Sequence, residues 1–170
     1  MRNTRQENLS EHSLEVAFIA HALAIINNTR LGGKADTNQV AVAAMFHDTT
    51  EIITGDMPTP IKYYNCDIKK VYKDIEKIAE NRLLEKLPED FKEEFQKIYS
   101  PDDITAKLVK AADKISALIK CIEESNMGNK EFAVAEKSTR KAIAELSCPE
   151  ADIFMEEFIK SFYLSLDEQN

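Results

Sequence analysis

The sequence is poor in residues that interrupt helices. It has only 4 glycines and 5 prolines among 170 residues. It also has no tryptophan. Sheet-rich chains need glycine and proline at frequent turns, and no segment shows the apolar–polar alternation of a half-buried strand. Alanine, leucine, isoleucine, lysine and glutamate are common instead and favour helix. The sequence therefore predicts an all-α fold of about six to eight helices in a single domain, residues 1–170.

The chain also lacks the positive charge that attracts polyanions. Its 22 basic and 30 acidic residues give a net charge of −8, so we expect neither polymeric nucleic acid nor a membrane as a partner. The N-terminus lacks the apolar core of a signal peptide, and no charge-free apolar segment is long enough for a membrane span. The cysteines, Cys66, Cys121 and Cys148, are scattered, which is typical of free thiols in a reducing cytoplasm.

Apolar periodicity and capping residues locate the expected helices. Ser10 is the expected cap of a buried helix to about residue 28, and Asp36 that of a nearly all-apolar helix. A short helix should end at Gly55, before a rigid loop containing Pro58 and Pro60. Further helices are expected over about residues 67–87, 88–99, 101–126 (capped by Ser100), 129–146 and 149–165.

A histidine–aspartate pair, His47–Asp48, ends the apolar second helix. Charged groups are costly there unless something compensates them, and a divalent cation would do so beside the negative end of the helix dipole. The alternative is a polar pair that simply ends the helix. His21 is expected to be structural, because it lies about half a turn out of phase with His12 on the first helix.

Two other helices carry further candidate ligands. His12 lies in the first turn of the first helix, and Asp113 lies within an apolar stretch of the helix expected over residues 101–126. With the pair at the end of the second helix, they would form a mixed nitrogen and oxygen site for a divalent transition metal. Such a site would leave positions for water and a phosphate oxygen. The alternative is that Asp113 pairs with Lys110 or Ser116.

Two acids follow the histidine–aspartate pair. Glu51 comes four residues after His47 and three after Asp48, which places it on the same side if the helix continues. A carboxylate that is near a metal but does not bind it can accept a proton from an attacking water. Asp56, in the loop GDMPTP, could face the same pocket. The alternatives are an exposed glutamate and an ordinary turn aspartate.

The motifs SEHS, HDTTEIITGDMPTP and KAAD, spread over nearly the whole chain, resemble those of the bacterial HD-domain 5'-deoxynucleotidases. The resemblance implies a helical HD-domain bundle, a homodimer, and hydrolysis of deoxyribonucleoside 5'-monophosphates with a divalent metal such as cobalt or manganese. It implies metal binding by His12, His47, Asp48 and Asp113, action of Glu51 on the attacking water, and a second essential acid, Asp56, near the substrate.

One departure from that family concerns the substrate pocket. Its members usually carry a leading helix with an arginine–tryptophan pair, in which arginine contacts the phosphate and tryptophan bounds the sugar. Because this sequence has no tryptophan, we expect weak discrimination against ribonucleotides. Arg2 or Arg5 could take the place of the family arginine, but we expect a weaker grip on the phosphate. Two alternatives remain: an HD phosphohydrolase for another small phosphate ester, and a non-catalytic metal-binding helical module. The spare acids Glu51 and Asp56 count against the module.

Overall fold

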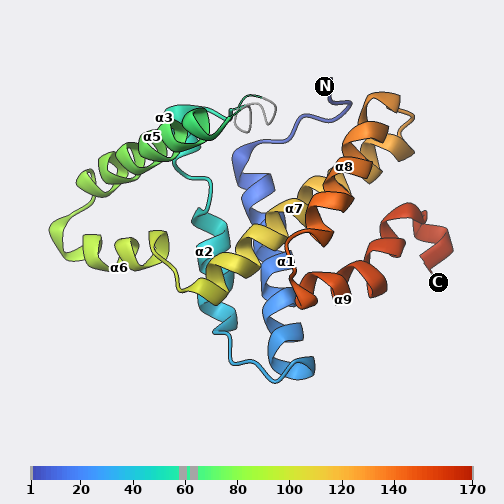
Figure 1. Ribbon diagram of the computed structural model, residues 1–170, viewed down its shortest axis with the longest axis horizontal. Coiled ribbons are helices and arrows are strands. Elements are labelled where there is room, and N and C mark those ends of the chain that lie inside the picture. Colours follow the sequence, from blue (N-terminus) through green and yellow to red (C-terminus); the bar gives the residue numbers. More distant parts are fainter. Residues whose placement is uncertain (1, 58–60, 62–64, 170) are drawn as a thin grey trace. The chain divides into compact units, whose positions relative to one another are not determined.

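The computed structural model describes residues 2–57, 61 and 65–169. In chain order the helices are α1 (Leu9–Arg30), α2 (Thr37–Phe46), α3 (Glu51–Thr54), α5 (Cys66–Glu85), α6 (Glu89–Tyr99), α7 (Asp103–Asn126), α8 (Ala133–Ala144) and α9 (Pro149–Glu157) (Figure 1). Short 3-10 segments cover η1 (Lys130–Phe132), η2 (Ile159–Tyr163) and η3 (Leu166–Gln169). No strand occurs among the described residues, so the all-α prediction is confirmed.

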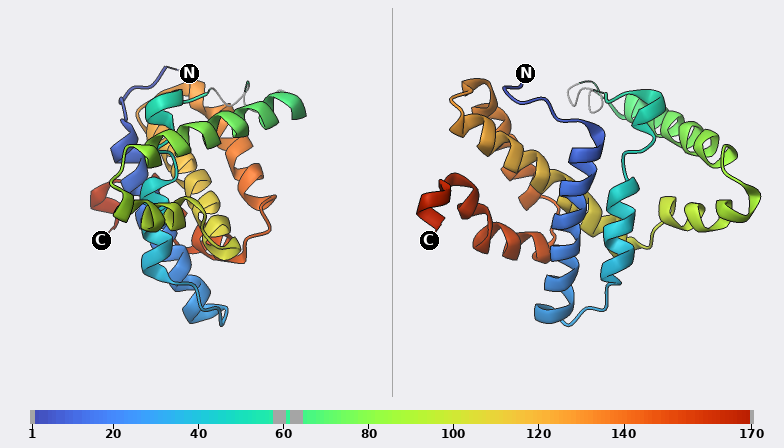
Figure 2. Two further views of the ribbon diagram at one scale, coloured as in Figure 1. Left: turned by 90° about the vertical axis from the view of Figure 1, so that its left-hand side faces the viewer. Right: turned by 180° about the vertical axis from the view of Figure 1, so that it is seen from behind.

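The contacts within the chain define two compact units. Unit 1 comprises Met1–Met45 and Asp102–Asn170, and unit 2 comprises Phe46–Pro101. In unit 1, α7 packs against α1, α8 and α9, and α1 also packs against α9 (Figure 2). In unit 2, α5 packs against both α3 and α6. That the two units act as one domain stays a prediction.

Unit 1 is organised around the contact between α1 and α7. Both helices contribute buried apolar side chains at helical spacing, and α2 adds three more to the same core. These core residues include Val16, Ala20, Leu23, Ala24, Val40, Ala43, Ala44, Leu108, Ala111, Ile115, Leu118 and Ile122. Burying one leucine or isoleucine side chain stabilises a fold by about 1.5–3 kcal/mol. The side chains buried between α1 and α7 therefore contribute substantially to the stability of unit 1.

Helix α1 also passes a simple test for a membrane span. Its length of 22 residues and mean hydropathy of 1.3 would allow it to cross a bilayer. However, 44% of its most apolar window is buried within the structure, and its buried face packs in the core of unit 1. The core helix of a globular protein and a signal sequence near the N-terminus pass the same test, so this helix is weak evidence for a membrane span.

Two predicted helix caps are wrong. Asn8, rather than Ser10, caps α1: its side chain accepts hydrogen bonds from two backbone N–H groups, and Glu11 accepts one from the backbone N–H of Asn8. Glutamate at the third helical position makes this reciprocal box available to Asn8 but not to Ser10. Likewise Asp102, rather than Ser100, caps α7 and accepts from the third helical N–H, where a carboxylate also complements the helix dipole.

Most other predicted boundaries are confirmed, but the last is not. Asp36 caps α2 by accepting two backbone hydrogen bonds, and Gly55 ends α3 at a positive φ of 69°. The predicted helix 149–165 instead stops at Glu157. From there Ser161 donates to the carbonyl of Phe158, the three-residue spacing of a 3-10 turn. The cysteines carry free thiols, as predicted.

Unit 2 contains one aromatic contact among its described residues. Phe46 and Phe95 meet edge to face with ring centroids 5.6 Å apart, and the hydroxyls of Thr49 and Tyr99 lie 3.0 Å apart. These contacts attach the turn after α2 to α6. The predicted loop prolines at positions 58 and 60 lie outside the described residues.

Candidate metal centre

The first candidate pair, His12 and Asp113, lies entirely within unit 1. The capping box at Asn8 fixes the first turn of α1, and the backbone N–H of His12 donates to the carbonyl of Asn8 at 3.1 Å. Helix α7 presents Asp113 beside it, with Nε2 of His12 3.5 Å from Oδ1 of Asp113. Both side chains are half-buried. Residues far apart in the sequence thus form one imidazole–carboxylate pair.

A second carboxylate, that of Glu15, lies on the Nδ1 side of His12 and is linked to it through Ser116. The hydroxyl of Ser116 donates to Oε2 of Glu15 at 3.0 Å and lies 3.4 Å from Nδ1 of His12. Burial raises the pKa of the Glu15 carboxyl above its ordinary value, and the hydrogen bond from Ser116 opposes this rise. Ser116, predicted as an alternative partner of Asp113, is therefore bonded toward His12 and Glu15.

Sequence reasoning missed Glu15. The signal was its position three residues after His12, which matches the position of Ser116 three residues after Asp113. Residues three apart lie on the same side of a helix, so both candidate ligands have a polar neighbour on their own helix face.

The second candidate pair, His47 and Asp48, lies in unit 2, in the turn that directly follows α2. Nε2 of His47 is 3.1 Å from Oδ2 of Asp48, and both side chains are half-buried. The backbone keeps turning here, because the N–H of Thr49 donates to the carbonyl of Phe46 and that of Glu51 to Asp48. The predicted location at the end of an apolar helix is confirmed.

The two acids predicted beyond this pair lie on α3 and just after it. Glu51 is the first residue of α3 and is half-buried, and Asp56 is exposed. Gly55 lies between α3 and Asp56, and its N–H donates to the carbonyl of Glu51 at 2.8 Å. Its positive φ is a conformation that side chains disfavour. This turn directs the chain away from α3, so Asp56 lies on loop rather than helix.

The chemistry of the donors fits a divalent transition metal. Each pair offers one imidazole nitrogen and one carboxylate oxygen, and all four residues, His12, His47, Asp48 and Asp113, are half-buried. Mixed nitrogen and oxygen ligands suit ions such as manganese, cobalt, iron or zinc, whereas calcium and magnesium favour oxygen alone. His21, which we expected to be structural, is also half-buried on α1.

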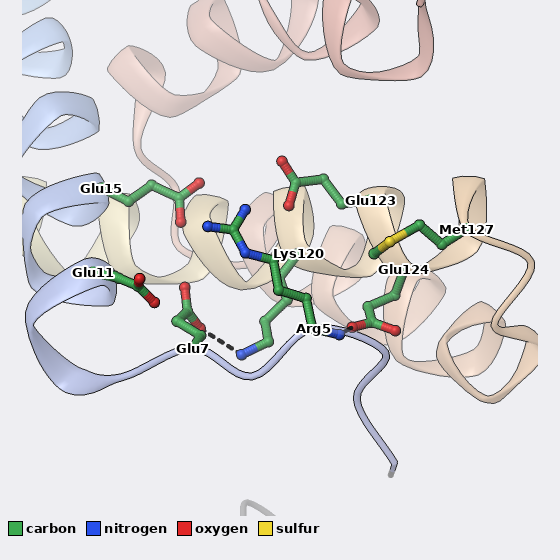
Figure 3. Close-up of a pocket in the computed structure, with 8 residues that line it drawn as sticks. All are labelled: Arg5, Glu7, Glu11, Glu15, Lys120, Glu123, Glu124 and Met127. Carbon is green, nitrogen blue, oxygen red and sulfur yellow. Dashed lines mark hydrogen bonds and ion pairs between the residues drawn. The ribbon is translucent and has the colours of Figure 1, made fainter.

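Unit 1 also contains an acidic pocket that Glu15 shares. The pocket has a volume of about 220 Å³ and is lined by Arg5, Glu7, Glu11, Glu15, Lys120, Glu123, Glu124 and Met127 (Figure 3). Lys120 forms an ion pair with Glu7. The main-chain N–H of Arg5 donates to Glu124, so Arg5, one of the two candidates to replace the family arginine, lies among carboxylates.

Comparison with known proteins adds a family and a fold. The family described as 5'-deoxynucleotidase YfbR-like matches residues 1–162. A 5'-deoxynucleotidase of Vibrio vulnificus is 51% identical over 171 residues, which cover 99% of this chain and 88% of that protein. One from Photorhabdus laumondii is 48% identical and covers 99% of this chain and 87% of that protein.

Among solved structures, an HD-domain phosphohydrolase of Listeria innocua superposes with a TM-score of 0.83 at 19% identity. The match covers 99% of this chain and 82% of that one. At this identity the similarity concerns the fold alone, and it confirms the prediction of an HD-domain helical bundle.

Proposed function

Since the chain belongs to the family of YfbR-like 5'-deoxynucleotidases, we propose that it hydrolyses deoxyribonucleoside 5'-monophosphates to deoxynucleoside and phosphate. The observation that carries this proposal is identity of about one half, over nearly the whole chain, to proteins named for that activity. The two histidine–aspartate pairs supply donors suited to a divalent metal, which this chemistry uses.

One divalent transition metal is proposed to be held by both pairs. Its ligands would be His12, His47, Asp48 and Asp113. When bound, the metal supplies positive charge that polarises the phosphoryl group. Cobalt and manganese are the first candidates, because the family resemblance implies them and because both accept imidazole and carboxylate ligands.

Glu51 is proposed as the general base. A water oxygen forms a bond to phosphorus while the bond from phosphorus to the 5' oxygen breaks. The carboxylate of Glu51 takes the proton that the water loses, and the 5' oxygen gains a proton to become the hydroxyl of the deoxynucleoside. Asp56, exposed beyond Gly55, is proposed to bind substrate as a second essential acid.

Partners and location follow from the same proposal. We expect a homodimer in the cytoplasm, with a small nucleotide as substrate and with neither polymeric nucleic acid nor a membrane as partner. The net charge of −8 supports the last two expectations. Light scattering coupled to size exclusion at micromolar concentration measures the oligomeric state, and a monomer would contradict the homodimer.

Phosphate release from a panel of deoxy- and ribonucleoside 5'-monophosphates, with cobalt or manganese added, tests the activity. Release from dAMP and TMP supports the proposal, and comparison with AMP and UMP measures the selectivity for deoxyribose. Release only from other small phosphate esters would identify a different HD phosphohydrolase. Bound metal without release from any ester would identify a non-catalytic module.

A further inference from the structure

Ser116 and Glu15 form a short hydrogen-bonded chain behind His12, within unit 1. Oγ of Ser116 is 3.0 Å from Oε2 of Glu15 and 3.4 Å from Nδ1 of His12. Ser116 is only 1% exposed, so water has little access to replace either contact. On the other side of the same ring, Nε2 lies 3.5 Å from Oδ1 of Asp113.

The direction of the hydrogen bonds among Glu15, Ser116 and His12 depends on which of these groups carries a hydrogen. A serine hydroxyl has one proton, and a carboxylate can only accept. Once Ser116 donates to Glu15, its oxygen presents only a lone pair to His12. The contact with Nδ1 is then favourable when Nδ1 carries a hydrogen, which leaves the lone pair of a neutral ring on Nε2.

We propose that Ser116 and Glu15 are positioning residues that hold His12 in the tautomer whose Nε2 can bind a metal. This inference rests on the proposed role of His12 as a metal ligand. Metal-binding histidines commonly donate their other ring N–H to a second group, and loss of that group costs about 10–100-fold in metal affinity. Here the carboxylate acts through a hydroxyl, because Glu15 sets the direction in which Ser116 points its proton.

A matched pair of glutamates separates this role from general electrostatics. Glu15 and Glu123 both line the acidic pocket of unit 1 (Figure 3), so removing either one takes the same charge from the same cavity. Glu15 alone of the two accepts the hydrogen bond from Ser116. An effect of charge would follow both substitutions, whereas an effect on the His12 ring would follow only Glu15.

The experiment measures cobalt(II) affinity, by competition with a chelator, and nitrogen NMR of the His12 ring in metal-free protein, assigned with His12→Gln. We expect Glu15→Ala and Ser116→Ala to weaken cobalt affinity about 10–100-fold and to mix the two tautomers. Glu123→Ala should match the wild type, and Ser116→Thr, which keeps the hydroxyl, should restore affinity. If Ser116→Ala fails to fold, Glu15→Ala on its own decides, since its side chain is only half-buried.

Wild-type affinity in Glu15→Ala, equal losses in Glu15→Ala and Glu123→Ala, or a wild-type ring protonated at Nε2 would each overturn the inference. Its failure differs from failure of the proposed function. A wild type that binds cobalt and shows the expected tautomer, but releases no phosphate, contradicts the activity and leaves the inference standing. A wild type that releases phosphate, in which Glu15→Ala leaves cobalt affinity unchanged, contradicts the inference and leaves the activity standing.

Discussion

His12 and Asp113 come from two long helices that pack through a continuous core, whereas His47 and Asp48 are neighbours in one turn. The first pair exists only when α1 and α7 have packed together. The second pair needs only the local hydrogen bonds that link α2 to α3. Side chains on packed helices are held more exactly than those on loops. The geometry of the first pair should therefore depend on the packing of unit 1, and that of the second pair on its local turn in unit 2.

The residues around the two pairs also differ in burial. Ile115, two residues after Asp113, is fully buried in the core of unit 1. The residues of α3, which begins three residues after Asp48, are all half-buried or exposed. Loss of core packing should disturb the first pair, and changes in α3 should leave the fold nearly unchanged.

The largest expected effect is the loss of one carboxylate from either pair, which tests whether both pairs are equally needed for metal binding. Asp113→Asn and Asp48→Asn should each abolish cobalt binding and lower phosphate release on the order of 10³-fold or more, since a catalytic metal contributes several kcal/mol. Bound cobalt and phosphate release are measured for both variants. Normal activity in one variant, with loss in the other, would mean that the pairs do not serve one ion.

The next effect separates metal binding from proton transfer in unit 2. Glu51→Gln should lower kcat by about 10²–10⁴-fold, the usual cost of losing a positioned general base, and should leave bound cobalt unchanged. Glu85→Gln, an exposed residue of α5, is the control and should retain full activity. Loss of cobalt from Glu51→Gln would make Glu51 a ligand instead.

The sequence sufficed for the helices and for both pairs, for different physical reasons. His47 and Asp48 stand out because a nearly all-apolar helix ends on two polar residues. Asp113 stands out because it interrupts the apolar face of another helix. The predicted caps failed because Ser10 and Ser100 each lie two residues from a better acceptor. For α1 the glutamate at position 11 already favoured Asn8.

The role of Glu15 could not be read from the sequence. On α1 it resembles any other acid, since its hydrogen-bond partner Ser116 lies 101 residues further along the chain. Local patterns carry little information on contacts at that separation unless the residue types are unusual, as histidines are in this chain. The spacing of three residues marks Glu15 and Ser116 as polar neighbours of His12 and Asp113 on their own helices, but not as partners of each other.

A third prediction sharpens the contrast in stability. Ile115→Ala should lower the free energy of unfolding by about 2–5 kcal/mol, because it leaves a cavity in a fully packed core. Ile52→Ala on α3, where the side chain is 70% exposed, should stay within about 0.5 kcal/mol of the wild type. Urea unfolding measures both, and a comparable loss in the two variants would mean that α3 is as tightly packed as the core.

The smallest effect concerns a buried carboxylate, Glu124, which ties the segment before α1 to α7. It is 2% exposed and accepts hydrogen bonds from the backbone N–H groups of Thr4 and Arg5 and from the side-chain amide of Asn129. Burial by itself would raise the pKa of Glu124, but these hydrogen bonds outweigh it and lower the pKa to about 2. Like the contact between His12 and Asp113, these hydrogen bonds join the N-terminal part of the chain to α7.

Because the pKa of Glu124 is lowered, its hydrogen bonds stabilise the fold only while the carboxylate is charged. The contribution of Glu124 is complete above its ordinary pKa of 4.5 and disappears as the pH falls toward about 2. Glu124→Gln should therefore unfold at lower urea concentration than the wild type near neutral pH, and the gap should narrow as the pH falls below 4.5. Glu123→Gln, one residue away on the exposed face of α7, should show no such narrowing. A gap that stays constant down to about pH 3 would mean that Glu124 acts by packing and not by charge, and the segment leading to His12 would then be held by shape alone.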